Sequence, residues 1–228
     1  MAIRTHSFSE VTDPGMYSID EAEQIARQLM EEGQRVPERC ALALQAEPPP
    51  DDGRAQRMLD LMARVTQPAR LLPLLDRILP SSNARIRSKA WKLYAAASGD
   101  LKWVQQQLDD PDPRVAANVV EALWRTRPCP ELHAIYHLAA NQERNRVAGN
   151  GLVGLFLCND PEAQDMTMRM AYHPDPDFRA TAAWVIGRVQ WREGRQLLLR
   201  LRDDSDDKVR LNAERAVQKL SRRYPGAA

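Results

Sequence analysis

The sequence has few cysteines and no long apolar run. Its three cysteines, Cys40, Cys129 and Cys158, are scattered and form no CxxC pair, which favours reduced thiols over a disulfide framework. No apolar stretch approaches the roughly 18 residues that a membrane span needs. The first residues also lack the apolar core of a secretory signal. We therefore expect a cytoplasmic protein that makes no contact with a membrane.

An excess of charge of one sign is missing as well. The 32 Lys and Arg residues nearly balance the 31 Asp and Glu residues, so the net charge is +1 and no global field favours nucleic acid or an anionic membrane. Aromatic residues make up only 6% of the chain, and β-branched residues seldom alternate with polar ones. This pattern argues against an all-β fold.

What the sequence does contain is internal repetition. Five apolar residues open similar segments rich in small residues, at intervals of 29 to 32 residues: Ile86, Val115, Val147, Phe178 and Val209. The positions 4, 7 and 8 residues later are again small or apolar, which places them on one side of a helix. A turn rich in Asp, Asn, Ser or Pro and a shorter amphipathic segment precede most of these helices. The predicted unit is helix–turn–helix, and stacked units of this kind form an α-solenoid.

The segments DPDPRVAANVVEAL, NRVAGNGLVGLF, DPDFRATAAWVIGRV and DDKVRLNAERAVQKL resemble the short HEAT repeats of bacterial HEAT-repeat proteins. The resemblance covers roughly residues 68–224 and implies an all-α, right-handed solenoid of about five helix pairs. It implies a binding surface rather than a particular reaction. The sequence has no His-Glu pair, which HEAT-repeat hydroxylases use at their di-iron sites, and no GxSxG, HExxH or GK[ST] motif. We expect that the protein is not an enzyme. Among the alternative functions, that of a lyase or glycosylase on this fold ranks last.

The N-terminal region is less regular than the repeats. The segments SIDEAEQIARQLMEEG and PERCALALQ predict two helices, and the proline-rich segment 47–53 predicts a loop. We expect a divergent helical cap over residues 1–53, with a loose start at residues 1–15, and a repeat array over residues 54–228. The last repeat helix, residues 206–224, is polar on its outward positions and is the expected C-terminal cap.

Two motifs could indicate a cofactor. The segment GNGLVG, residues 149–154, matches the dinucleotide fingerprint GxGxxG, but that fingerprint requires a preceding strand. Gly151 and Gly154 instead fall at the small-residue positions of a repeat helix, so they predict close helix packing.

Cys129, His133 and His137 lie at i, i+4 and i+8 on one flank of a predicted helix, and two His one turn apart can chelate a metal ion. Because no carboxylate or second Cys stands at ligand spacing, we expect partly buried imidazoles in a contact between repeats. The sequence predicts no metal and no cofactor.

Basic residues flank the opening residue of each repeat helix. They are Arg85, Arg87, Arg114, Arg146, Arg179, Lys208 and Arg210. Stacked along a solenoid, they would form a stripe that could track phosphates, as in HEAT-like DNA glycosylases. Asp residues fill the adjacent turns, so ion pairs between repeats are the favoured interpretation. Nucleic-acid binding is the alternative function.

The outward positions of the repeat helices should be polar, yet the middle repeats carry apolar residues there. Together with Lys92 and Glu121 at the rim of the groove, these positions form the predicted partner-binding stripe: Trp91, Val120, Trp124, Leu152, Val153, Phe156 and Trp184. Exposed apolar surface marks interaction sites, and Trp is enriched among binding hot spots. We therefore expect a non-catalytic scaffold whose concave groove binds an apolar helix or an extended peptide of a partner protein. The alternative is that tight curvature, or residues 1–50, cover this stripe internally.

Overall fold

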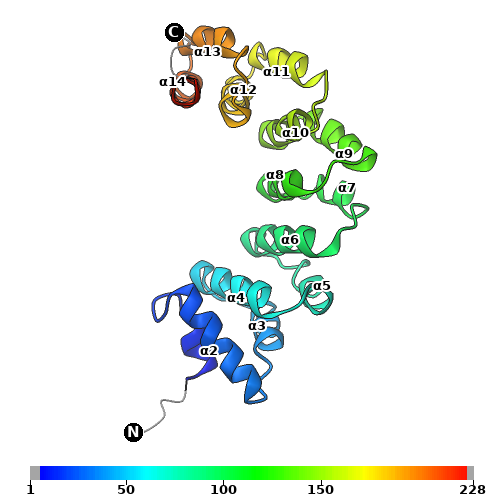
Figure 1. Ribbon diagram of the computed structural model, residues 1–228, viewed down its shortest axis with the longest axis vertical. Helices are drawn as coiled ribbons and strands as arrows, with labels where there is room; N and C mark the ends of the chain where they lie inside the picture. The colour runs from blue at the N-terminus through cyan, green and yellow to red at the C-terminus, as the bar shows by residue number, and fades with distance from the viewer. Residues whose placement is uncertain (1–5, 225–228) are drawn as a thin grey trace. The chain divides into compact units, whose positions relative to one another are not determined.

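The structure is a computed structural model that describes residues 6–224 (Figure 1). Within these residues it contains α-helices and one 3₁₀ turn and no strand, which confirms the predicted all-α class. None of the described helices has the length and apolar character needed to cross a membrane. The helices pack as two units, of which the first ends at Asp100 and the second begins at Leu101.

Over residues 6–100, the first unit contains six helices: α1 (Phe8–Val11), α2 (Ile19–Glu31), α3 (Val36–Leu44), α4 (Asp52–Val65), α5 (Pro68–Asp76) and α6 (Ala84–Ser98). Helix α4 packs against α2, α3 and α6, and its Leu61 and Met62 are fully buried among them. Because α4 shares a core with α2, α3 and α6, the boundary between the two units falls after Asp100. The sequence predicted a boundary after residue 53.

The segment before α2 is described from His6 onward and contains α1. Residues 1–5 lie outside the described residues, so the expected loose start can be compared only for residues 6–15. Ser7 and Glu10 form a capping box at the N-terminus of α1, and Val11 is fully buried. For this part the expectation of a loose start is wrong, because an apolar side chain anchors the segment in the core.

As far as Tyr224, the last described residue, the second unit contains the 3₁₀ turn η1 (Leu123–Arg125) and eight helices: α7 (Val104–Gln107), α8 (Pro113–Ala122), α9 (Pro130–Ala140), α10 (Asn145–Leu157), α11 (Ala163–Ala171), α12 (Pro176–Val189), α13 (Arg195–Arg202) and α14 (Asp207–Arg223). The longer helices α8, α10, α12 and α14 pack side by side in one layer. The helices α7, α9, α11 and α13 each pack on the longer helix that follows them (Figure 1). The second unit is therefore a stack of helix pairs, the arrangement predicted from the repeats.

Local sequence signals set the start of the longer helices. Asp112, Asp175 and Asp206 are N-cap residues whose carboxylates accept hydrogen bonds from backbone N–H groups in the first turn. Pro113 and Pro176 follow two of these caps at the first helical position, where a missing N–H costs nothing. The acidic turns that recur along the sequence thus encode the starts of α8, α12 and α14, whereas α10 follows Arg144, which makes no side-chain cap bond.

Glycines let α9 and α10 approach each other closely. A Cβ atom on Gly151 would lie 2.5 Å from the Ala140 nitrogen and 2.8 Å from the Tyr136 carbonyl oxygen. A Cβ atom on Gly154 would lie 2.3 Å from the Tyr136 ring. The GxGxxG match therefore lies inside a helix and serves packing, as the sequence predicted.

Candidate functional site: a polar groove on the layer of longer helices

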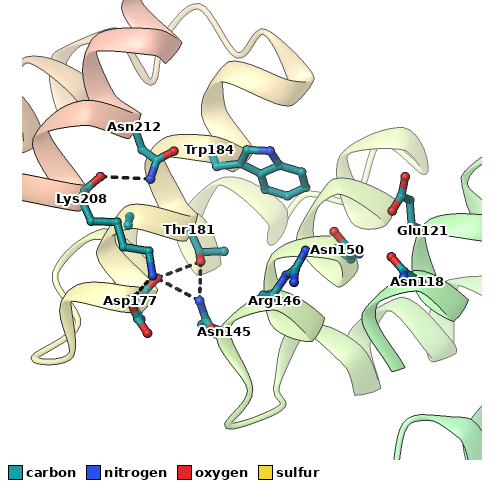
Figure 2. Close-up of a pocket in the computed structure, with 11 residues that line it drawn as sticks. Asn118, Glu121, Asn145, Arg146, Asn150, Asp177, Thr181, Trp184, Lys208 and Asn212 are labelled. Atoms are coloured by element: carbon teal, nitrogen blue, oxygen red, sulfur yellow. Dashed lines mark hydrogen bonds and ion pairs between the residues drawn. The ribbon is translucent and has the colours of Figure 1, made fainter. Parts of the chain in front are cut away.

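A groove of about 510 Å³ runs across α8, α10, α12 and α14 in the second unit (Figure 2). We call it the polar groove. Its lining residues are Asn118, Glu121, Asn145, Arg146, Asn150, Asp177, Ala180, Thr181, Trp184, Lys208 and Asn212. Its volume lies within the range typical of ligand sites.

The repeat register explains why these side chains meet. The polar residues three positions after the repeat residues Val115, Val147, Phe178 and Val209 lie on α8, α10, α12 and α14: Asn118, Asn150, Thr181 and Asn212. Because the helices pack side by side in the same register, equivalent positions line one face of the layer. The sequence shows this row of polar residues, but the prediction from the apolar residues overlooked it as a site.

Two of the asparagines hold the helices of the groove together. The buried side chain of Asn150 donates to the Ala117 carbonyl oxygen at 2.6 Å, and the backbone carbonyl oxygen of Asn150 accepts from Trp124 Nε1 at 3.1 Å. The side chain of Asn145 donates to Thr181 Oγ1 at 3.0 Å (Figure 2). These bonds join α8 to α10 and α10 to α12, so the floor of the groove is preorganised.

Charged side chains of both signs face the groove. Lys208 forms an ion pair with Asp177, and the side chain of Asn212 donates to the Lys208 carbonyl oxygen at 3.0 Å. Arg146 is exposed, and within residues 6–224 it has no ion-pair partner. A guanidinium with this exposure is available to bind a carboxylate from a partner molecule.

Aromatic side chains from the predicted stripe meet next to the groove. Trp124 and Trp184 are half-buried, with ring centroids 6.3 Å apart, and the Arg188 guanidinium carbon lies 5.0 Å from the Trp124 ring centroid. Phe156 is also half-buried and contacts the Trp191 ring at a centroid distance of 5.7 Å. The structure thus brings Trp124 and Trp184 together and leaves part of each ring in solvent.

Four other residues of the predicted stripe are buried. The exposed fractions of Trp91, Val120, Leu152 and Val153 are 8%, 0%, 1% and 2%. The expectation that they face solvent is wrong: α10, which carries Leu152 and Val153, is covered by α8 and α12 on its flanks and by its paired helix α9. Lys92 and Glu121, the predicted rim residues, are half-exposed. Trp91 and Lys92 belong to the first unit, and a role of either in partner binding stays a prediction.

Most of the predicted basic stripe has internal partners. Arg87, Arg179 and Arg210 each donate from Nη1 to two carbonyl oxygens of the preceding turn, at 2.7 to 3.0 Å. Arg179 also forms a two-point ion pair with Asp204 of the next turn, at 2.8 and 2.9 Å. Arg85 pairs with Asp52, Arg114 with Asp112 and Lys208 with Asp177. The pairs of Arg85, Arg179 and Lys208 reach another helix pair, as the ion-pair interpretation expects, whereas the Arg114 pair lies within one turn and Arg146 has no ion pair among residues 6–224.

A second polar cluster lies away from the groove, on α9 and the connection from α10 to α11. His133 and His137 both contact the Asp160 carboxylate there. The sequence predicted no metal here because no carboxylate stands at ligand spacing from these histidines. In the structure the Asp160 carboxylate reaches them from a distant position in the chain. Cys129 is not among the groups whose ligand atoms converge.

Residues 130–218 match the family described as HEAT repeats. The matched segment contains α9 to α13 and most of α14, and therefore most of the polar groove. Proteins of this repeat family commonly serve as scaffolds for protein interactions and are generally not enzymes. No curated protein matches the sequence.

Proposed function

We propose that the protein is a non-catalytic scaffold and that its polar groove binds an extended segment of a partner protein. The observation that carries this proposal is the row of amide and hydroxyl side chains at successive helices of one face. A primary amide both donates and accepts hydrogen bonds, as a peptide group does. Asn145, Asn150 and Asn212 already donate within the protein, so their side-chain oxygens are the groups that would accept from the backbone N–H groups of an extended segment.

The charges and rings around the groove suggest what the partner segment contains. The exposed guanidinium of Arg146 favours a carboxylate, from an Asp or Glu side chain or from a chain terminus. The half-buried rings of Trp184 and Trp124 offer an apolar surface next to it. We therefore expect an acidic residue followed or preceded by an apolar one in the bound segment.

The proposed binding surface contains fewer apolar residues than the stripe predicted from the sequence. Trp124, Phe156 and Trp184 keep a role as exposed aromatic contacts, and Glu121 lies in the groove. Val120, Leu152 and Val153 support the helices from within, since they are buried. The apolar stripe is thus reduced to a few aromatic residues beside a polar surface.

A displayed library of random peptides, selected on the full chain, tests the proposal. Affinities of the selected peptides are then measured for the wild type and for Arg146→Glu and Trp184→Ala. We expect Arg146→Glu to weaken binding by about 10-fold or more, as charge-assisted hydrogen bonds are lost. Trp184→Ala should weaken it by about 2 kcal/mol.

Arg169→Glu is the matched control, because it makes the same charge reversal at an exposed residue of α11 outside the groove. Thermal unfolding of each variant separates lost binding from lost folding. Selected peptides that bind all variants and the wild type equally would show that the polar groove is not the binding surface.

The same variants address the alternative of nucleic-acid binding. If phosphates are contacted, affinity for a generic duplex falls steeply as salt rises. We expect no duplex binding beyond weak non-specific attraction at physiological salt, since most of the basic stripe is paired internally. Micromolar binding at that salt, lost when Arg87, Arg114 and Arg146 are changed to Glu, would favour the alternative.

A further inference from the structure

Two histidines and one aspartate converge on the side of the second unit formed by α9. His133 and His137 stand one helical turn apart on α9, so both imidazoles project from the same flank. Each Nε2 atom contacts the same carboxylate oxygen, Oδ2 of Asp160, and the distance from His137 is 2.9 Å. The three potential ligand atoms all lie within 4.8 Å of one another.

The backbone fixes the position of this carboxylate. Helix α10 ends at Leu157, and Asn159 adopts a left-handed conformation with φ of 55°. The chain then turns so that the Asp160 N–H donates to the Leu155 carbonyl oxygen at 3.0 Å. The other carboxylate oxygen, Oδ1, accepts from the Glu162 N–H at 2.7 Å. Oδ2 is therefore held toward the imidazoles.

The close approach of α9 and α10 brings the two parts of the cluster together. Gly151 and Gly154 of α10 face the Tyr136 and Ala140 region of α9, one turn along from the histidines. A side chain at either glycine would push the helices apart and carry Asp160 away from α9. The packing glycines are thus a condition for the cluster.

The carboxylate is a buried anion. The Asp160 side chain is 3% exposed, whereas those of His133 and His137 are 42% and 30% exposed. Burial acts to raise the pKa of Asp160, but hydrogen bonds from His137, the Glu162 amide and His133 outweigh it, so the pKa lies below its ordinary value. Both imidazoles contact this carboxylate, and because they are half-exposed the cluster is open to an ion from solution.

We propose that His133, His137 and Asp160 form a binding site for a divalent transition-metal ion, with Zn²⁺ as the best match. Two imidazole nitrogens and one carboxylate oxygen form a common ligand set for Zn²⁺. The site supplies three protein ligands and leaves a further position for water or for a ligand from solution. None of the three residues lines the polar groove, so the proposal is independent of the proposed function.

The observed geometry is close to what such an ion requires. At bond lengths of 2.0–2.1 Å, ligand atoms around a tetrahedral Zn²⁺ are about 3.3 Å apart. The contact of 2.9 Å between His137 and Asp160 therefore has to open by only a few tenths of an ångström. The widest separation among the three ligand atoms, up to 4.8 Å, has to close toward 3.3 Å. Rotation of the two half-exposed imidazoles provides both changes, while the carboxylate keeps its bond to the Glu162 N–H.

A bound ion would join α9 to the connection between α10 and α11. These segments are adjacent helix pairs of the stack, so the ion would stabilise the folded second unit against unfolding. The metal would act as a structural link with an open coordination position. No catalytic step is implied.

Calorimetric titration of the full chain with ZnCl₂, after treatment with a chelator, tests the site. The variants are His137→Gln, Asp160→Asn and, as a matched control, His173→Gln, which removes an imidazole of the same unit outside the cluster. Asp160→Asn keeps an oxygen for the Glu162 N–H and removes the charge. We expect one ion per chain for the wild type and the control, and affinity lower by about 100-fold or more for the other two.

Thermal unfolding provides a second readout. Zn²⁺ should raise the unfolding temperature of the wild type and of His173→Gln, and should leave that of His137→Gln and Asp160→Asn unchanged. Helical circular dichroism identifies any variant that fails to fold, and His133→Gln replaces such a variant. Wild-type affinity no tighter than that of Asp160→Asn would overturn the proposal.

Cobalt(II) checks the ligand set, because Cys129 and Cys158 are near the cluster. Among the described residues, the ligand atoms that converge there belong to His133, His137 and Asp160 and to neither cysteine. We expect visible cobalt bands without a thiolate charge-transfer band. A strong thiolate band would assign the ion to the cysteines and would overturn the assignment to His133, His137 and Asp160.

Discussion

Replacing Gly151 by Ala tests the close packing of α9 and α10, on which both the helix stack and the His–Asp cluster depend. In an exposed helix this change stabilises the protein by up to about 1 kcal/mol, because Ala is the better helix former. In α10 the new Cβ would lie 2.5 Å from the Ala140 nitrogen, 2.8 Å from the Tyr136 carbonyl oxygen and 2.9 Å from the Ala139 carbonyl carbon. All three are backbone atoms, which cannot rotate away.

The magnitude follows from the shift that the helices must make. Ordinary contacts of a Cβ atom begin at 3.4 Å, so α9 and α10 have to separate by about 0.9 Å at this point. Overpacking of a well-packed core costs about 1–3 kcal/mol, and a backbone collision belongs at the upper end. After subtraction of the gain in helix propensity, we expect a net loss of about 2 kcal/mol. For a chain of this size the unfolding temperature falls by about 4–8 °C.

Thermal and urea unfolding, followed by circular dichroism, measure this loss. Gly53→Ala is the matched control, since Gly53 lies in the first turn of α4 and its Cβ would make only contacts of 3.4 Å. That variant should be as stable as the wild type or slightly more so. A Gly151→Ala protein as stable as the wild type would refute the close packing of α9 and α10.

Two further predictions concern the inter-repeat ion pair and the C-terminal helices. Hydrogen bonds from Arg179 hold the pKa of Asp204 at about 2, below its ordinary value of 3.8. Ionised Asp204 therefore stabilises the fold above pH 4, and this contribution is lost as the pH falls toward 2. In urea unfolding, the difference in free energy of unfolding between the wild type and Asp204→Asn should shrink over that range. A difference that stays constant would contradict this. Deleting residues 193–228 removes α13 and α14 and uncovers the face of α12 where Gly187 packs on Ala216. We expect aggregation in gel filtration, whereas a soluble fragment that unfolds cooperatively would contradict the C-terminal cap.

The sequence alone determined the helix pairs and their limits. The acidic turns that end in Asp112, Asp175 and Asp206 are local N-cap signals, and local hydrogen bonds decide where a helix starts. The small residues at fixed offsets predicted which helices pack closely, and Gly151 shows why, since its neighbours leave no room for a Cβ atom. These features depend on residues within one repeat, so a periodic pattern is enough to predict them.

The width of the buried face was decided by the tertiary structure. Periodicity predicts the direction of a helix face, but not how many neighbours cover it. Trp91 and Val120 occupy positions predicted to face solvent and are buried, whereas Trp184, at a similar position, remains half-exposed beside the polar groove. Helices on both flanks of a stacked helix extend the contact beyond one face, and only their placement shows how far.

The His–Asp cluster depends entirely on tertiary structure. Asp160 follows His133 by 27 residues and His137 by 23, so no ligand spacing in the sequence joins them. They meet because α9 and α10 pack closely and because the turn after α10 directs the carboxylate back toward α9. The polar groove is an intermediate case: the repeat register places its asparagines in the sequence, and the side-by-side packing of four helices makes them one surface.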